Sequence, residues 1–315
     1  MQRVVETRPV VGLMLPTAAN TDDGKVDPGR VIDAAVRAEA AGFDGAYVGD
    51  HILHPRPLLE SVVTLSVVAA STRRISLGPC VMLIALRQPL VLAKQLGSLA
   101  SFAPGRLRIG VGVGGEYPAE FAAAEVPLSD RGRRMEAALL QLRALLRGDV
   151  DQTGVTIAPA AGAVTFLLAG WKERSLRRAA TYGDGWIGYL LAPDSFARRR
   201  ELLLDCRVQQ GRREGGFTTG ILLPVHVGPD ADQARSHAAA GWARLTGAPS
   251  SFPEKLFLGG RPDEIVQQLR AYWDRGCTEM ILAPADQGDA YLDQLTALSE
   301  DVLPGVREFT GGPGP

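Results

Sequence analysis

The chain has 315 residues, of which 46% are hydrophobic and 22% charged, and its formal net charge is −1. This composition is typical of a globular protein with a large core, and the near-zero charge gives no reason to expect a nucleic-acid partner. No apolar run approaches the ~20 residues of a membrane span, and no signal-peptide pattern opens the sequence. Three scattered cysteines (Cys80, Cys206, Cys277) predict a cytoplasmic protein with neither a disulfide framework nor a metal site.

The first half of the chain alternates short apolar runs with amphipathic segments. Residues 10–15 form a continuous apolar run that stops at Pro16, which predicts a buried strand. Asp27 and Pro28 then supply a helix cap and a first-turn proline, and Gly42 ends the helix. The alternation continues with strands at the start of 46–55, at 75–83 and at 107–112, and with helices at 58–71, 89–101 and 130–147.

The second half repeats this order. We expect strands at 165–169, 184–190, 220–227 and 279–284, and helices at 173–182, 194–210, 230–245, 262–275 and after the last strand. Eight strands separated by helices in about 300 residues predict a (β/α)8 TIM barrel with inserted loops at the C-terminal face of the strands. A doubly wound open sheet is the alternative, but no G-x-G-x-x-G follows the first strand.

Domain boundaries and insertions follow from the same pattern. Segments 114–129, 149–164 and 246–260 are predicted insertions, and residues 1–310 are predicted to form one domain. The glycine- and proline-rich tail at 311–315 is predicted to be disordered. Because a barrel carries its active site at the C-terminal ends of its strands, Asp50 and His51 after the second strand are candidate functional residues. The alternative is that Asp50 only caps the following turn.

Five stretches, taken in order, resemble the bacterial-luciferase-like flavin and deazaflavin oxidoreductases. They are AEAAGFDGAYVGDH (38–51), STRRISLGPCVM (71–82), the run 87–117 that ends in GVGVGGEY, RRAATYGDGW (177–186) and FLGGRPDEIVQQLRAYWDRGC (257–277). The resemblance implies a (β/α)8 barrel that binds reduced coenzyme F420 or reduced FMN. The GDH and PCV motifs favour the F420-dependent branch. The resemblance to the family also implies a homodimer formed through helices of the first half of the chain.

The resemblance assigns roles to the first candidate residues. It places His51 beside the deazaflavin edge as a catalytic proton carrier, which suits an imidazole that titrates near pH ~6.5. Asp50 contacts the cofactor or holds the local geometry. Some F420-dependent members carry a tryptophan shortly after this histidine, and here His54 and Pro55 take its place. Sugar-phosphate oxidation is therefore a less favoured activity for this chain.

Two further segments border the cofactor ring by resemblance. Cys80 and Val81 are expected to be joined by a non-prolyl cis peptide that backs the middle of the ring, whereas composition alone favours an ordinary buried cysteine. Gly114 and Gly115 let the backbone approach the ring closely. Glu116 is the second catalytic acid/base candidate, and a solvated loop glutamate is its alternative.

A third segment, AGWKERSLRRAA (169–180), is the phosphate candidate. Ala169 and Gly170 end a strand, and the helix that follows offers free N–H groups to an anion. Most relatives have a second or third glycine and a serine here, and this chain has Trp171 and Lys172 instead. Lys172 and Arg174 supply charge for the phosphate or for the acidic tail of F420. The alternative is a basic, solvated helix face.

Three functions remain open at this point. The first is an F420-dependent oxidoreductase that transfers a hydride between reduced deazaflavin and a small organic substrate, with C=C or C=N reduction as the expected reaction. The second is an FMN-dependent luciferase-like monooxygenase, and the third is a non-catalytic barrel that binds the cofactor without turnover. His226 and His237 have no partner at metal-ligand spacing and are predicted to be structural.

Overall fold

The computed structural model describes residues 8–19, 24–149, 154, 156–162, 164–212, 216–247 and 252–310. Within them the strands are parallel and alternate with helices. The strands are β1 (Val10–Met14), β2 (Gly45–Val48), β3 (Ser76–Pro79), β4 (Arg108–Val111), β5 (Thr165–Ala169), β6 (Gly185–Tyr189), β7 (Thr218–Val227), β8 (Leu258–Gly260) and β9 (Glu279–Pro284). The predicted tail at 311–315 lies outside the described residues, and the single domain of 1–310 stays a prediction.

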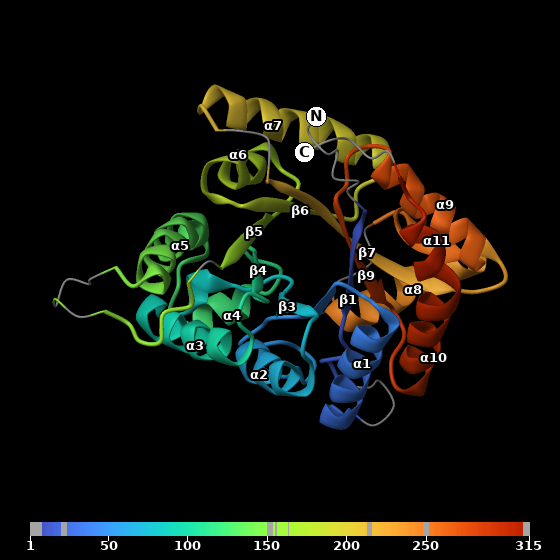
Figure 1. Ribbon diagram of the computed structural model, residues 1–315, viewed down its shortest axis with the longest axis horizontal. Coiled ribbons are helices and arrows are strands. Elements are labelled where there is room, and N and C mark those ends of the chain that lie inside the picture. The colour runs from blue at the N-terminus through green and yellow to red at the C-terminus, as the bar shows by residue number, and fades with distance from the viewer. Residues whose placement is uncertain are drawn as a thin grey trace, which may run out of the picture.

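The helices form an outer ring around the strands (Figure 1). They are α1 (Pro28–Ala41), α2 (Ser61–Ser71), α3 (Pro89–Phe102), α4 (Pro118–Ala123), α5 (Arg131–Arg147), α6 (Glu173–Tyr182), α7 (Pro193–Gln209), α8 (Ala231–Thr246), α9 (Pro262–Trp273), α10 (Asp289–Ala297) and α11 (Leu303–Arg307). None of these helices is both long enough and apolar enough to cross a membrane. The structure confirms the predicted (β/α)8 barrel.

Local sequence signals set the helix ends. The Asp27 carboxylate accepts a hydrogen bond of 3.2 Å from the Arg30 N–H, and Pro28 occupies the first turn of α1. Gly42 ends α1 in the left-handed conformation at φ 90°, which glycine adopts without steric cost. Helix α2 begins at Ser61 rather than at residue 58, because the Glu60 side chain caps it by accepting from the Val63 N–H at 2.7 Å.

Eight strands make the barrel in the order β3-β2-β1-β9-β7-β6-β5-β4. The ring closes between β3 and β4, where parallel bridges join Leu77 to Leu107 and Met82 to Val111. Close approach of the two backbones requires Gly78, because a Cβ at that position would lie 1.8 Å from the carbonyl oxygen of Arg108. The predicted open-sheet alternative is therefore excluded.

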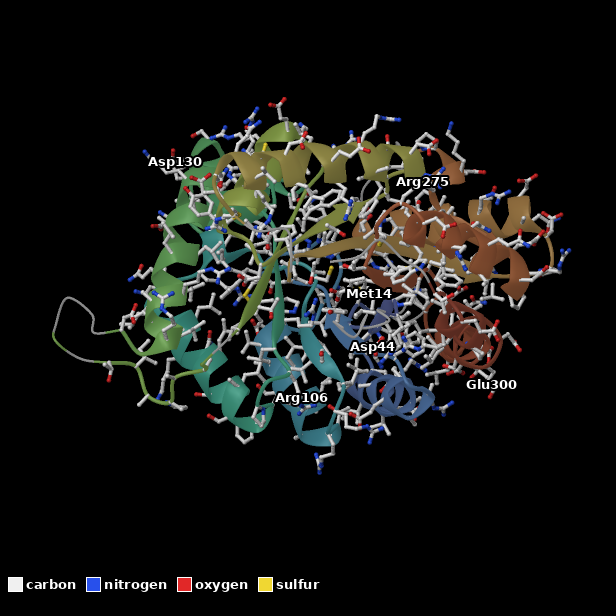
Figure 2. All side chains as sticks on the ribbon, turned by 45° about the horizontal axis from the view of Figure 1, so that its top comes forward. Met14, Asp44, Arg106, Asp130, Arg275 and Glu300 are labelled. Atoms are coloured by element: carbon white, nitrogen blue, oxygen red, sulfur yellow. The ribbon has the colours of Figure 1, made fainter. Side chains whose placement is uncertain are left out.

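The core has two layers, as alternation along barrel strands requires. The larger layer packs outward-facing strand residues against the helices. The inner layer contains Tyr47, Cys80, Leu167, Ile187, Leu222, Ile281 and Ala283, with Met14, Val81, Ala169, Tyr189 and Trp242 packed against it. Figure 2 shows Met14 near the middle of the molecule and Arg275 and Glu300 on its outside.

Buried charges fill the amino-terminal end of the barrel interior. Glu279 at the start of β9 is fully buried and bonds both the Tyr47 hydroxyl and the Arg108 guanidinium. Burial, followed by the negative charge of Glu279, raises the pKa of Tyr47 well above its ordinary value. The functional residues therefore have to lie at the other end, where the strands terminate.

One α-helix and one strand of the described residues lie inside the predicted insertions. Helix α4 falls within 114–129, and β8 falls within 246–260 and pairs with β7 outside the ring order. Strand β7 pairs with β6 up to Leu222 and with β8 from Val225 onward. Pro224 lies between these two pairings, where the missing proline N–H is tolerated.

Candidate active site

The predicted site residues converge at one end of the barrel. Asp50 and His51 follow β2, Cys80 and Val81 follow β3, and residues 114–116 follow β4. Residues 169–172 end β5 and lead into α6. Because all the ring strands are parallel, these segments share one rim, which we call the mouth of the barrel.

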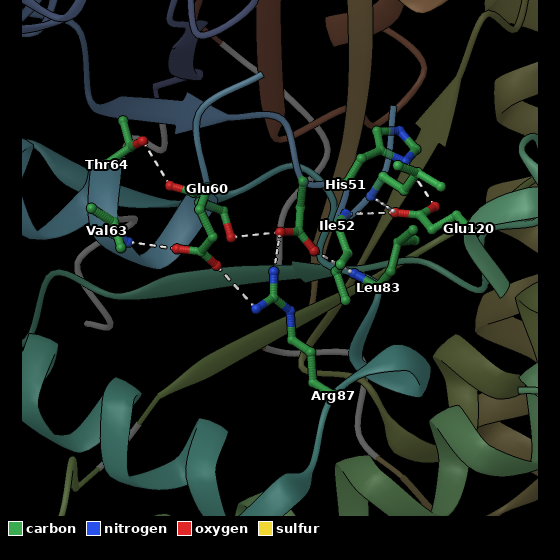
Figure 3. Close-up of polar contacts among 11 residues, drawn as sticks. His51, Ile52, Glu60, Val63, Thr64, Leu83, Arg87 and Glu120 are labelled. Carbon is green, nitrogen blue, oxygen red and sulfur yellow. Dashed lines mark hydrogen bonds and ion pairs between the residues drawn. The ribbon is translucent and has the colours of Figure 1, made fainter. Parts of the chain in front are cut away.

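The Asp50 carboxylate connects the loop after β2 to α2 and to the segment after β3. Its buried carboxylate accepts from the Ser61 hydroxyl at 2.6 Å and from the Leu83 N–H at 2.9 Å, and it pairs with the Arg87 guanidinium. Arg87 also pairs with Glu60 at 3.0 Å (Figure 3). Both carboxylate oxygens thus have partners within the protein. These contacts support the geometric role for Asp50, one of the two that the resemblance left open.

His51 is hydrogen-bonded to a carboxylate that the sequence analysis missed. Its Nδ1 lies 3.1 Å from Oε2 of Glu120, which comes from α4 and is 1% exposed (Figure 3). The other Glu120 oxygen accepts from the backbone N–H groups of Ile52 at 2.6 Å and Leu53 at 3.2 Å. Glu120 therefore fixes both the imidazole of His51 and the backbone that follows it.

The charge state of Glu120 follows from these contacts. Burial alone would raise the pKa of its carboxyl group, but the hydrogen bond and charge of His51 and the two backbone N–H groups lower it below the ordinary value. Glu120 is thus an anion at neutral pH. An anionic acceptor requires a proton on Nδ1 of His51, which leaves Nε2 as the nitrogen that exchanges a proton.

A cluster of three rings surrounds His51. Its ring centroid lies 5.0 Å from that of His54 and 5.1 Å from that of Tyr117, which contacts both imidazoles edge-on. Burial is the largest of the effects that lower the pKa of His54, and it favours a neutral imidazole. The Tyr117 hydroxyl is buried without a hydrogen-bond partner among the described residues. This hydroxyl packs beside Gly247 at the end of α8, where a Cβ on the glycine would lie 3.3 Å from it.

Glu116, the second catalytic candidate, is exposed and makes no hydrogen bond or ion pair within the described part of the chain. The sequence signal for its buried neighbour is Pro118, a first-turn proline that begins α4 and places Glu120 in that turn. The proposed role of Glu116 stays a prediction, whereas Glu120 is the carboxylate in contact with His51.

The Cys80–Val81 segment forms an apolar wall of the barrel interior. The peptide bond between these residues is cis, as the resemblance implied. Val81 packs so closely against β4 that a Cβ at Gly112 would lie 2.4 Å from its Cγ2. Burial raises the pKa of the Cys80 thiol, which therefore stays neutral and is no nucleophile. Ala169 packs against the same inner layer.

The β5–α6 turn presents free cations. Gly170 has φ 135°, and a Cβ there would lie 2.6 Å from the Cβ of Ser175. No side chain caps the first turn of α6. Lys172 and Arg174 are exposed, and their side chains have no partner among the described residues. The turn therefore joins a helix N-terminus to two unpaired positive charges.

Aromatic residues line the mouth next to the β5–α6 turn, and Trp171 comes from the turn itself. The Trp171 ring lies 6.0 Å from Tyr189 and 6.3 Å from Phe252. The Trp242 indole N–H, from α8, donates to the Tyr189 hydroxyl at 2.5 Å. Burial raises the pKa of Tyr189 to about 12, and the nearby Glu116 and Tyr117 add to this rise. We call Trp171, Tyr189, Trp242 and Phe252 the aromatic cluster.

A family model described as luciferase-like monooxygenase matches residues 10–276. The chain belongs to the luciferase-like monooxygenase family. The family predicted from the five motifs is thus confirmed, and with it the expectation of an enzyme.

Relatives of this luciferase-like protein include both sequences and solved structures. It is 28% identical to the F420-dependent glucose-6-phosphate dehydrogenase of Intrasporangium calvum, over 89% of this chain and 95% of the relative. An F420-dependent secondary alcohol dehydrogenase structure, in complex with an F420-acetone adduct, aligns with TM-score 0.78 and 17% identity over 96% of this chain and all of the other. Monooxygenase RslO1 of Streptomyces bottropensis aligns with TM-score 0.78 and 21% identity over 93% and 98%. The two structures show a shared fold.

The mouth of this luciferase-like barrel fits a flat ring system with an anionic tail. The apolar Cys80–Val81 wall and the aromatic cluster suit a planar ring. Lys172 and Arg174 suit phosphate or carboxylate groups.

Proposed function

We propose that the protein is an F420-dependent oxidoreductase that transfers a hydride between reduced F420 and a small organic substrate, with reduction of a C=C or C=N bond as its reaction. The observation that carries the proposal is the His51–Glu120 pair, which sets a proton-exchanging imidazole at the mouth. The 28% identity to an F420-dependent dehydrogenase over most of both chains supports the choice of cofactor.

In this proposal, reduced F420 supplies the hydride when bound. His51 holds a proton on Nδ1 against Glu120 and donates or accepts a second proton at Nε2. Glu120 does not touch substrate; it positions His51 and stabilises the protonated imidazole. Cys80 and Val81 exclude water from one side of the mouth, and the β5–α6 turn, through Lys172 and Arg174, binds the anionic part of the cofactor.

The side chains at the mouth favour an uncharged, planar substrate. The aromatic cluster offers ring faces. His54, in the place where some F420-dependent members carry tryptophan, packs at a tilt against His51 and edge-on against Tyr117. Its lowered pKa keeps it neutral, so it gives no positive charge to a sugar phosphate. An enone or a cyclic imine therefore suits the mouth better than glucose 6-phosphate.

The proposal includes a homodimer and a cytoplasmic location. Helices α2 and α3 pack together and expose large apolar side chains to solvent, namely Val63, Val67, Leu90, Val91 and Phe102. A second copy of this chain is the proposed partner for this surface, because contiguous apolar patches mark interfaces. The cysteines are buried free thiols, which supports a reducing compartment.

A binding and turnover experiment tests the function. Purified protein is titrated with F420 and with FMN in both redox states, and oxidation of reduced F420 is then followed with an enone, a cyclic imine and glucose 6-phosphate. We expect micromolar binding of F420, weak or no binding of FMN, and turnover with the enone or the imine. Tight FMN binding with oxygen consumption would instead establish a monooxygenase, and binding of F420 without turnover would leave a cofactor-binding barrel.

A further inference from the structure

A second cluster of titratable groups lies apart from the His51–Glu120 pair. It contains His226 near the end of β7, His237 on α8 and Asp286 after β9, and we call it the His–Asp–His cluster. Their spacing in the sequence predicts only structural roles for the two histidines. The barrel brings them together because β7 and β9 are neighbours and α8 packs back against β7.

The geometry of the cluster is that of three converging ligands. Nδ1 of His226 lies 2.8 Å from one oxygen of Asp286, and Nε2 of His237 lies 2.8 Å from the other. The imidazole centroids are 4.0 Å apart, and one ligand atom from each residue lies within 4.8 Å of the other two. Each imidazole contacts a different oxygen of one carboxylate, and the three side chains converge closely enough for a shared cation to replace the two hydrogen-bonded protons.

Burial of the three side chains also suits a cation. The Asp286 side chain is 6% exposed, that of His226 is 20% exposed and that of His237 is 45% exposed. The negative charge is therefore buried, while one ligand faces solvent and gives an ion a path of entry. Among the described residues, no lysine or arginine side chain pairs with the Asp286 carboxylate to replace the ion.

Bond lengths define the side-chain movement that a metal requires. Zinc binds imidazole nitrogen at about 2.0–2.1 Å and carboxylate oxygen at about 2.0–2.2 Å. At those lengths a tetrahedral site needs ligand atoms about 3.3 Å apart, so each 2.8 Å contact has to open by roughly half an ångström and the widest separation, at most 4.8 Å, has to close by up to about 1.5 Å. Two imidazoles and a carboxylate form a ligand set that Zn²⁺ and its neighbours prefer, and solvent completes the coordination.

We propose that His226, His237 and Asp286 bind a divalent transition-metal cation, with Zn²⁺ as the preferred ion, which fastens α8 to the ends of β7 and β9. The position of α8 matters because it carries Trp242 into the aromatic cluster. Arg56 connects the same region to the loop after His51, since it donates to the Arg244 carbonyl at 2.8 Å and to the Gln287 side chain at 3.3 Å. The ion thus supports the mouth without touching the substrate.

Metal titration of the full-length protein, prepared without a histidine tag and stripped with chelator, tests the proposal. We expect one equivalent of Zn²⁺ to bind at micromolar or lower dissociation constant by calorimetry, and Co²⁺ to give visible ligand-field bands. Zn²⁺ should also raise the melting temperature. His226→Ala, His237→Ala and Asp286→Asn should each weaken binding at least tenfold.

The matched control is His54→Ala, because the chain has four histidines and His54 lies outside the cluster. This variant should keep one equivalent of Zn²⁺. The proposal is wrong if the stripped wild-type protein binds no Zn²⁺ at micromolar concentration, or if binding persists in Asp286→Asn and His237→Ala. The wild-type titration decides the question even if a variant fails to fold. Every readout is independent of F420 and of turnover.

Discussion

Replacing Glu120 with glutamine removes one buried charge beside His51 while keeping the size of the side chain. One glutamine oxygen can still accept from the Ile52 and Leu53 N–H groups, which both bond the same Glu120 oxygen. The amide NH₂ then faces Nδ1 of His51, 3.1 Å from the present acceptor. Because an NH₂ group donates, Nδ1 has to become the acceptor, and the imidazole proton moves to Nε2.

The size of the effect follows from the bond that is lost. A hydrogen bond to a charged group contributes about 1.5–3 kcal/mol, and each ~1.4 kcal/mol changes a rate tenfold. If the protonated His51 is needed in the transition state, Glu120→Gln should lower the rate of reduced F420 oxidation roughly 10- to 100-fold. Binding of F420 should stay within about twofold, since Glu120 is buried beneath the mouth.

Two assays check this reasoning. Single-turnover absorbance gives the rate of reduced F420 oxidation with the substrate that the turnover experiment identifies. ¹⁵N-detected NMR of the imidazoles gives the His51 tautomer without any substrate. Glu201→Gln is the matched control, because Glu201 is exposed on α7 and has no contact with His51 among the described residues. An unchanged rate together with a proton still on Nδ1 in Glu120→Gln would refute the positioning role.

Four further outcomes are expected. The double variant Lys172→Ala/Arg174→Ala should weaken F420 binding roughly tenfold, by about 1.4 kcal/mol, in a fluorescence titration. Arg177→Ala on the same helix should leave F420 binding unchanged, because the Arg177 guanidinium is already paired with Glu173 at 2.7 Å. Gly78→Ala should lower the free energy of unfolding by more than about 4 kcal/mol or prevent folding, because a Cβ meets the Arg108 carbonyl. Gly49→Ala, where a Cβ has only one distant neighbour at 4.0 Å, should lower it by under about 1 kcal/mol. Equal effects of the two variants in denaturant titration would contradict the barrel closure. Asp44→Asn should lower the free energy of unfolding by about 1–3 kcal/mol at pH 7. Burial would raise the pKa of Asp44, but Arg8, the Val11 N–H and Arg307 lower it, so the stabilisation is present above the ordinary pKa of ~3.9. It should shrink as the pH falls below that value, which melting temperatures at several pH values test. Val63→Glu combined with Val91→Glu should convert the proposed dimer to a monomer in sedimentation. Dimers that persist in this variant, or a monomeric wild type, would rule out α2 and α3 as the interface.

The barrel could be predicted from the sequence because its signals are local. Apolar runs of strand length, first-turn prolines and helix-ending glycines each act within a few residues, and their alternation specifies the topology. Strand β8 could not be found this way, since its three residues are too short to show a period. Helix α4 is similarly short, at six residues.

The site was predicted less completely, because its partners meet through the fold. His51 and Glu120 are 69 residues apart and belong to different βα units. The glycine-rich loop favours Glu116 as the functional carboxylate, whereas the short helix α4 that follows the loop places the buried Glu120 against His51. Likewise, His226 and Asp286 are 60 residues apart and meet only because β7 and β9 are adjacent in the ring.

The aromatic cluster gives the protein a built-in optical probe. Of the four tryptophans, Trp171 and Trp242 belong to it, while Trp186 and Trp273 lie in the outer core layer. A chromophore held at the mouth would accept excitation energy from the first pair and also from Trp186, whose indole N–H donates to the Gly170 carbonyl at 2.7 Å. Indole emission can therefore report ligand binding at the mouth in real time without a label. Trp→Phe variants at positions 171 and 242 would show how much of the signal each of these two indoles contributes.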